Sequence, residues 1–265
     1  MASTDSLLES SVRTLSKWTR PAGWTGNGGM NRKVRPLRPR LISIIIPAHN
    51  EEGYLGPTLD ALQRQTYPWF EAIVVANGCT DDTVEVAKGR CHQLLVLSQK
   101  SLGVARNLGA RMAKGELLLF LDADTTLDPM ALRTVAEDFS KDVAAGTLKG
   151  RPDAEHFGYR LIYWLKNSVH RFSLHSGSSG VIICWKDHFM RTGGFDEGLE
   201  VRENSELMKR LKRLGTYKYL GDATATTSMR RYEQFGCWRI VWLWIKLWVQ
   251  SLFGDLHQRR YETVR

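Results

Sequence analysis

The chain has 265 residues, of which 43% are hydrophobic and 25% are charged. This composition excludes a chain that is disordered throughout, because it supplies enough apolar side chains for a substantial core. The formal net charge is +9, and the excess of Lys and Arg is concentrated in residues 1–40 and 230–265, around a nearly neutral middle. An evenly basic domain would have indicated nucleic acid, whereas basic ends fit either solubilising tails or contact with an anionic lipid surface.

The four cysteines are scattered, without the paired spacing of a zinc site or a disulfide framework. Reduced thiols of this kind are typical of proteins in the cytosol. Together with the basic ends, they predict a cytoplasmic protein that is peripheral at the inner face of the membrane and has no nucleic-acid partner.

Residues 1–40 precede the first strongly patterned part of the chain. Residues 20–40 combine Gly, Pro and Arg without hydrophobic periodicity, so we expect this basic segment to be poorly ordered. Within it, the apolar residues of 5–18 fall on one side of a helical wheel and predict a short helix.

From residue 41 the sequence alternates between short apolar runs and amphipathic stretches. Short continuous apolar runs are typical of strands that are buried on both faces, and the stretches between them have a helical period. This pattern predicts strands over 41–46, 70–75, 94–97 and 116–121, and helices over 53–64, 80–88 and 103–113. Such alternation indicates an α/β fold with a mostly parallel central sheet flanked by helices. Beyond residue 128 the pattern is looser, apart from a charged helix expected over 203–214.

Polar clusters follow three of the predicted strands, at residues 47–51, 77–81 and 122–124. In a parallel sheet these clusters would open at one edge, where the ligands of such sheets bind. The sequence therefore predicts a ligand site at the carboxyl ends of these strands.

Asp122 and Asp124 are the sharpest signal within this site, because they directly follow an apolar run. Two carboxylates so close together repel each other unless a cation lies between them. Their hard oxygens suit Mg²⁺ or Mn²⁺, with phosphate oxygens completing the shell. The alternative is a helix-capping turn, in which Asp124 or Asp128 caps the helix near 129–138.

Five short motifs follow one another in the same part of the chain. They are SIIIPAHNEE (43–52), NGCTDD (77–82), GVARN (103–107), FLDAD (120–124) and GGFDE (193–197). In this order they resemble the serial motifs of family 2 glycosyltransferases, and the resemblance covers about residues 41–230. It implies a GT-A-type nucleotide-sugar-binding fold and transfer of a sugar, with inversion at the anomeric carbon.

The resemblance assigns the base and ribose pocket to the first two motifs. Pro47, Ala48 and Glu51 would line this pocket. Asn77 stands where the family usually has an aspartate that contacts the base. This departure leaves the preferred base open, because an amide donates as well as accepts hydrogen bonds.

The resemblance also implies roles around the diphosphate. Asp124 would hold the metal directly, Asp122 would reach the ribose or the metal, and Arg106 would lie over the nucleotide. The pair Arg230 and Arg231 could grip the diphosphate, as guanidinium geometry allows. The alternatives are a helix-surface charge for Arg106 and a basic membrane-flanking pair for the other two arginines.

The family's general base is usually the Asp of a Glu-Asp pair, and Asn204 takes its place here. An amide accepts no proton near neutral pH, so Glu203 or Glu206 would have to serve, and we favour Glu203. The alternative is an N-terminal helix turn in which acids favour the helix dipole. A phosphate acceptor would need no base.

Residues 235–253 are apolar and contain four tryptophans, with three polar residues close to one helical stripe. This pattern predicts an amphipathic C-terminal helix lying in a membrane interface, flanked by basic residues. The alternatives are a helix buried against the domain or a partner, and a membrane-spanning helix.

These expectations combine into one organisation of the chain. A basic segment (1–40) precedes a catalytic domain (41–230), which has a nucleotide-sugar half (41–125) and an acceptor half (126–230), and a Trp-rich basic segment (231–265) follows. The expected activity is metal-dependent transfer from a nucleoside-diphosphate sugar to a membrane lipid or lipid-linked glycan, with Mg²⁺ or Mn²⁺ as the cofactor. The alternative is a non-catalytic nucleotide-sugar-binding or peripheral-membrane scaffold protein of the same fold.

Overall fold

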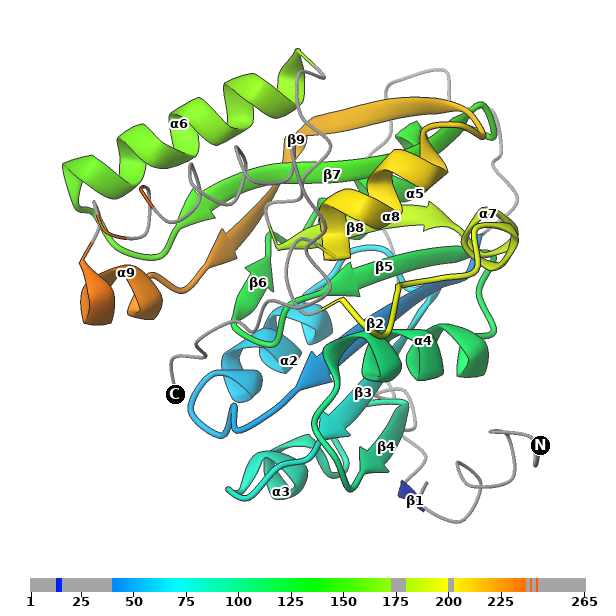
Figure 1. The fold of residues 1–265 in the computed structure, drawn as a ribbon, viewed down its shortest axis with the longest axis vertical. Helices are drawn as coiled ribbons and strands as arrows, with labels where there is room; N and C mark the ends of the chain where they lie inside the picture. Colours follow the sequence, from blue (N-terminus) through cyan, green and yellow to red (C-terminus); the bar gives the residue numbers. More distant parts are fainter. Residues whose placement is uncertain are drawn as a thin grey trace.

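The computed structural model describes residues 13–15, 40–172, 180–199 and 203–236, together with Arg239 and Trp242. These residues form one sheet with helices on both of its faces (Figure 1). The strands are β1 (Arg13–Leu15), β2 (Ile42–Ala48), β3 (Phe70–Asn77), β4 (Gln93–Leu97), β5 (Leu117–Leu121), β6 (Thr125–Leu127), β7 (Val143–Pro152), β8 (Val181–Trp185) and β9 (Thr216–Thr227). The helices are α2 (Leu55–Gln63), α3 (Thr83–Ala87), α4 (Leu102–Met112), α5 (Ala131–Asp138), α6 (Phe157–Arg171), α7 (Lys186–Arg191), α8 (Glu203–Leu211) and α9 (Arg230–Phe235).

The strand order of the sheet is β1-β4-β3-β2-β5-β8-β7-β9-β6. Strands β4, β3, β2 and β5 are parallel neighbours and form the part of the sheet that the alternating pattern predicts. Strand β8 joins antiparallel to β5 and β7, while β7 and β9 run parallel to each other. The prediction of an α/β fold with a mostly parallel sheet flanked by helices is confirmed. The looser pattern beyond residue 128 corresponds to the antiparallel pairs.

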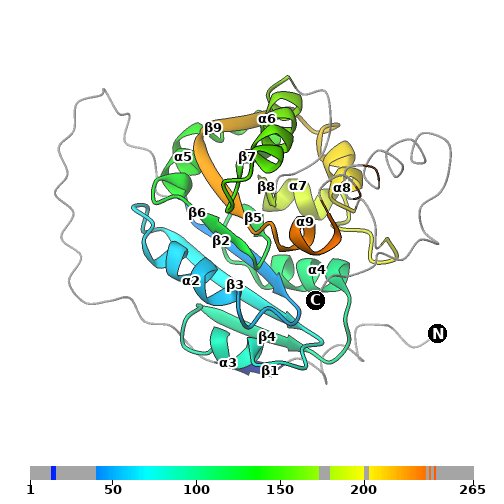
Figure 2. The same cartoon turned by 90° about the vertical axis from the view of Figure 1, so that its left-hand side faces the viewer.

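The sheet is buried on both faces, which explains the continuous apolar runs. Along β2, Ile44 and Ile46 belong to one core, whereas Ile45 belongs to the other. The first core lies between the sheet and helices α2, α3 and α5, and the second lies between the sheet and helices α4, α7 and α8 (Figure 2). A strand with an apolar side chain at every position fits only such a sandwiched place.

The prediction of a helix over residues 5–18 is wrong at Arg13–Leu15. These three residues form β1, which pairs antiparallel with β4 so that Thr14 lies opposite Leu95. Strand β4 would otherwise leave its outer backbone groups unpaired at the edge of the sheet, and β1 supplies hydrogen-bond partners for them. The other residues of 5–18 lie outside the described part of the chain.

The predicted C-terminal helix over 235–253 also lies largely outside the described residues. Of its apolar side chains, Trp242 is described and exposes 70% of its surface. Among the described residues, no helix has the length and apolarity that crossing a bilayer requires.

Gly115, between α4 and β5, provides a test of the close packing under the sheet. Its amide donates to the Ser43 hydroxyl over 2.8 Å, and a Cβ at this position would overlap the carbonyl oxygen of Leu41. Because a backbone carbonyl cannot move aside, we expect Gly115→Ala to lower the free energy of unfolding by about 2–4 kcal/mol. Urea denaturation measures this loss. Gly53→Ala is the matched control, since nothing lies within 4 Å of its Cβ, and an equal loss in both variants would contradict the steric cause.

Candidate active site

The polar clusters that follow β2 and β3 are joined to each other by hydrogen bonds. Asn50 adopts a left-handed backbone conformation with φ of 53°, and its Oδ1 accepts from the amide of Thr80 over 2.8 Å. The amide of Glu51 donates to the Thr83 hydroxyl over 2.6 Å. On the other side, the Thr58 hydroxyl donates over 2.8 Å to the carbonyl of Ala123. The three clusters predicted to converge therefore meet at one edge of the sheet.

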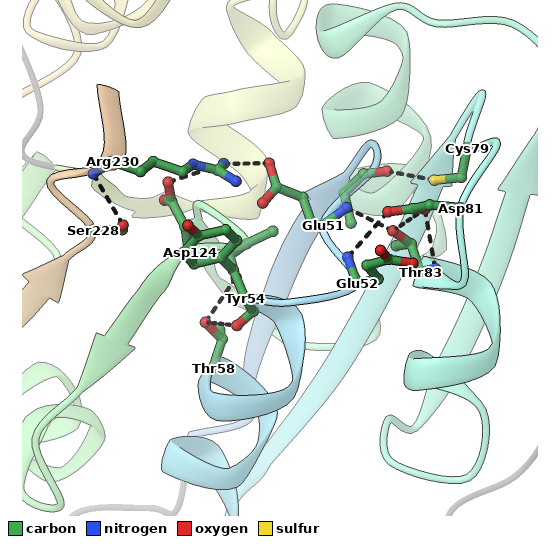
Figure 3. Close-up of polar contacts among 12 residues, drawn as sticks. Glu51, Glu52, Tyr54, Thr58, Cys79, Asp81, Thr83, Asp124, Ser228 and Arg230 are labelled. Atoms are coloured by element: carbon green, nitrogen blue, oxygen red, sulfur yellow. Dashed lines mark hydrogen bonds and ion pairs between the residues drawn. The ribbon is translucent and has the colours of Figure 1, made fainter. Parts of the chain in front are cut away.

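Arg230 of α9 lies between two acidic side chains of this edge (Figure 3). Its Nη2 is 2.6 Å from Glu51 Oε1 and 3.2 Å from Asp124 Oδ2. The guanidinium also stacks on the ring of Tyr54, with 4.2 Å between Cζ and the ring centroid. Arg230 thus links α9 to the loop after β2 and to the turn after β5.

The carboxylates of this edge carry more negative charge than their surroundings neutralise. Burial and the neighbouring charge of Asp122 raise the pKa of Asp124 to about 6, although Arg230 and Arg231 act in the opposite direction. Burial also raises the pKa of Glu51, again against the effect of Arg230. Glu51 Oε2 is buried and has no hydrogen-bond partner among the described residues. The edge is therefore arranged to receive a further positive charge.

Arg106 of α4 is the centre of a second group of charged side chains, next to the group around Arg230. Its Nη1 donates to Glu203 Oε1 and Asn204 Oδ1, each over 2.9 Å, and its Nη2 lies 3.1 Å from Asp122 Oδ1. The guanidinium is stacked over the ring of Phe195, and the residue is only 4% exposed. Arg106 therefore links the turn after β5 to the start of α8.

The two candidate general bases on α8 lie in different surroundings. Glu203 is buried and contacts Arg106, so it belongs to the group of charged side chains around Arg106. Glu206 instead pairs with Arg210, whose Nε lies 2.8 Å from Glu206 Oε1, and Arg210 also donates to the carbonyl of Thr192. Of the predicted residues on α8, the structure groups Glu203 and Asn204 with Asp122, and keeps Glu206 apart from them.

Three residues expected to line the base pocket are buried at the strand ends. Pro47 and Ala48 are the last residues of β2, and Asn77 is the last residue of β3. Asn77 is 2% exposed, and its Oδ1 accepts from the amide of Ser101 over 2.8 Å. Its side chain thus holds the start of α4 in place, and its contact with a nucleotide base stays a prediction.

Two of the sequence motifs bond directly to each other. Asn107 Nδ2 donates to the carbonyl of Phe195 and to Glu197 Oε1, each over 2.9 Å, and Asn107 Oδ1 accepts from the amide of Phe195. The GVARN segment of α4 and the GGFDE segment therefore act as one unit, which places Phe195 beneath Arg106.

Comparison with known proteins identifies the family of this chain. The family model described as "Glycosyl transferase family 2" matches residues 43–233, which is most of the chain. The chain belongs to glycosyl transferase family 2. The predicted resemblance to this family is confirmed.

Curated relatives contain the same region as part of much longer chains. The hyaluronan synthase of Pasteurella multocida is 28% identical over 208 residues, which is 71% of this chain and 21% of the synthase. The poly(ribitol-phosphate) β-N-acetylglucosaminyltransferase TarS of Staphylococcus aureus is 31% identical over 119 residues, which is 41% of this chain and 21% of TarS. This chain therefore spans about a fifth of the length of these relatives.

Solved structures of the family share the fold. The mannosyltransferase PcManGT of Pyrobaculum calidifontis, in complex with GDP-Man and Mn²⁺, aligns with a TM-score of 0.61 and 19% identity over 72% of this chain and 57% of that one. Residues 1–349 of S. aureus TarS, in complex with UDP-GlcNAc, align with a TM-score of 0.55 and 22% identity over 70% of this chain and 58% of that one. These matches support the GT-A fold assigned above.

The carboxylates of this edge offer the oxygen ligands that a divalent cation prefers. No group of three or more His, Cys, Asp or Glu side chains in the described part of the chain forms a complete cation site. A site with two protein carboxylates, completed by phosphate and water oxygens, needs no such group. The sequence predicts Asp122 and Asp124 for this role, and their binding of a metal stays a prediction. The raised pKa of Asp124 and the unpartnered oxygen of Glu51 agree with a missing positive charge.

Two aromatic residues of the site were not found from the sequence. Tyr54 stacks on Arg230, and Phe195 stacks on Arg106. Phe195 lies within the GGFDE motif, and Tyr54 follows the first motif by two residues. Both stacking contacts join residues that are far apart in the sequence, so no local pattern could have indicated them.

The raised pKa of Asp124 predicts that this residue destabilises the ligand-free protein. A carboxyl with a pKa of about 6 in the folded chain and 3.8 in an unstructured peptide binds more protons when folded, so stability falls as the pH rises through this window. The free energy of unfolding of Asp124→Asn at pH 7.5 should therefore exceed that of the wild type by about 1–3 kcal/mol. The difference should shrink as the pH falls below 6 and vanish below the unfolded-state pKa of 3.8. Calorimetry across this range measures it, and a variant less stable than the wild type at pH 7.5 would contradict the expectation.

Proposed function

We propose that this protein is a metal-dependent glycosyltransferase that moves a sugar from a nucleoside-diphosphate sugar to a membrane lipid or lipid-linked glycan. The observation that carries the proposal is the meeting of two arginines and four carboxylates at the carboxyl ends of β2 and β5. The carboxylates and arginines are those of Glu51, Asp122, Asp124, Glu203, Arg106 and Arg230. Relatives solved with GDP-Man or UDP-GlcNAc support a nucleotide-sugar donor.

In this proposal the nucleotide-sugar half (41–125) binds the donor. Pro47, Ala48 and Glu51 line the base and ribose pocket, with Asn77 at its floor. The acceptor half (126–230) supplies Glu203 and Arg230, and Arg231 is the first residue of the segment that follows. The choice of base would depend on the hydrogen bonds that the loops after β2 and β3 offer to it.

Asp122 and Asp124 would hold Mg²⁺ or Mn²⁺. When bound, the metal neutralises negative charge that builds on the leaving diphosphate. Arg230 and Arg231 act on the same charge, because a guanidinium can bind phosphate oxygens through two parallel hydrogen bonds. The complex of PcManGT with Mn²⁺ supports a divalent metal in this family.

In the transfer step an acceptor hydroxyl oxygen bonds to the anomeric carbon while the bond from that carbon to the diphosphate oxygen breaks. The hydroxyl proton passes to the Glu203 carboxylate, and the nucleoside diphosphate leaves with the bonding electrons. Arg106 fixes Glu203 against Asp122 and so sets the position of the base relative to the donor. Attack from the face opposite the diphosphate inverts the anomeric carbon. Where the acceptor is a phosphate, the proton transfer is not required.

The proposed lipid acceptor and the membrane contact rest on charge and composition. The basic residues are concentrated at the two ends of the sequence, and the residues after α9 are rich in tryptophan. Each basic residue near an anionic bilayer contributes about 1 kcal/mol of binding. The protein would act as a peripheral protein at the inner face of the membrane.

Donor binding is tested by thermal shift with UDP-, GDP- and dTDP-sugars, with and without Mn²⁺. A donor at 100 times its dissociation constant adds roughly 2.7 kcal/mol to the stability, so one base should raise the melting temperature clearly in the presence of Mn²⁺. Asp124→Asn should abolish this shift because it removes a metal ligand. Binding by the wild type without any transfer to a membrane lipid extract would favour the scaffold alternative, and no shift with any donor would exclude the proposal.

The role of Glu203 is tested with two matched variants of the same helix. Glu203→Gln should keep the donor-dependent thermal shift and lose at least about 100-fold in transfer, because the amide cannot take the proton. Glu206→Gln should keep both, since Glu206 pairs with Arg210 away from Arg106. Transfer of a radiolabelled sugar to the lipid extract measures the difference. Undiminished turnover by Glu203→Gln would exclude it as the base.

A further inference from the structure

Helix α6 exposes a row of large apolar side chains. Phe157, Leu161, Trp164, Leu165 and the adjoining Phe172 expose 78%, 41%, 63%, 49% and 69% of their surfaces. Their spacing places them on one side of the helix, because residues three, four and seven positions apart share a face. A contiguous apolar patch of this kind on a folded domain marks an interaction surface.

Basic residues border this row. Arg160 and Arg171 are exposed and lie along the edge of the same helix face, next to the line of Trp164. Arg160 is only loosely paired, since its Nη1 is 3.7 Å from Glu155. From 149 to 172 the chain carries five Lys or Arg and two acidic residues, so the surroundings of the row are positively charged.

The opposite face of α6 packs against the helix that carries Arg230. Tyr163 belongs to a small core with Met229 and Tyr232, against which Phe235 is packed. Lys166 Nζ donates to the Tyr232 hydroxyl over 3.1 Å. Helix α6 therefore packs against α9 through its inner side chains and carries the exposed apolar row on its outer face.

We propose that the outer face of α6 docks on an anionic lipid bilayer. Trp, Phe and Leu bordered by Arg are the side chains that favour the boundary between lipid headgroups and acyl chains. The chain also continues from Phe235, beside α6, into the Trp-rich residues 238–248. The inference deepens the proposed function and rests on it for its purpose, because a docked α6 would bring α9 close to a lipid-linked acceptor.

Vesicle co-sedimentation of the full chain tests the docking. The vesicles contain phosphatidylcholine with or without phosphatidylglycerol. Trp164→Glu should lower the partition coefficient on the anionic vesicles at least tenfold, because a charge is introduced at the centre of the row. Trp164→Phe should bind as the wild type does. The matched control is Met112→Glu on α4, which alters a side chain of 40% exposure on another helix and should leave binding unchanged.

The basic border has its own expected effect. Arg160→Gln and Arg171→Gln should each lower binding to the anionic vesicles about fivefold, and raising the salt concentration should reduce the difference. Vesicles of phosphatidylcholine alone should bind the wild type and both variants with similar, weaker affinity.

Three results would overturn the inference. The first is wild-type protein that binds none of these vesicles, and the second is undiminished binding by Trp164→Glu, which would assign the contact to another segment. The third is a wild-type dimer in analytical ultracentrifugation that Trp164→Glu dissociates, which would make the face an interface between copies. Thermal shift with the nucleotide-sugars separates this outcome from the proposed function, because Trp164→Glu should keep the wild-type donor response.

Discussion

Acidic side chains gathered at the edge of a sheet require positive charge close by, and this requirement connects the distant parts of the molecule. Glu51, Asp122 and Asp124 come from the loop after β2 and the turn after β5. Their charges are met by Arg106 from α4 and Arg230 from α9. A buried charge without a partner costs several kcal/mol, so the positions of α4 and α9 are coupled to the sheet edge.

The arginines neutralise the negative charge of these carboxylates only in part. Asp124 keeps a raised pKa although Arg230 contacts it, and one oxygen of Glu51 remains buried without a partner among the described residues. A site optimised only for stability would remove these groups or pair them fully. Perturbed acids at the carboxyl ends of parallel strands are typical of functional sites, where stability is given up for ligand binding.

Helix α6 connects α9 with the surface of the molecule. Its inner side chains join α9 through Tyr163, Lys166 and Tyr232, while its outer side chains are apolar and exposed. The helix also packs on β7 and β9, which lie beyond the four parallel strands β4, β3, β2 and β5. The contacts with α9 and the proposed lipid contact thus lie on two opposite faces of one helix.

The sequence by itself determined the parallel half of the fold and the location of the site. Apolar runs such as 117–121 suit only strands buried on both faces, and the polar residues after them, Asp122 and Asp124, mark the sheet edge. Helix boundaries differ by a few residues from those predicted, because capping and fraying decide the ends. The three-residue strand β1 was missed, because an edge strand of this length carries no periodic pattern.

Only the tertiary structure decided which charges meet. Glu51 and Arg230 are 179 residues apart, and no local pattern relates them. Glu203 and Glu206 stand one turn apart on α8, yet packing turns the first toward Arg106 and the second toward Arg210. Likewise, the sequence of α6 has apolar side chains on more than one face of the helix. Packing against β7, β9 and α9 decides which of these faces is buried. Local sequence determines elements through short-range sterics and hydrophobicity, whereas pairing between distant side chains depends on how those elements pack.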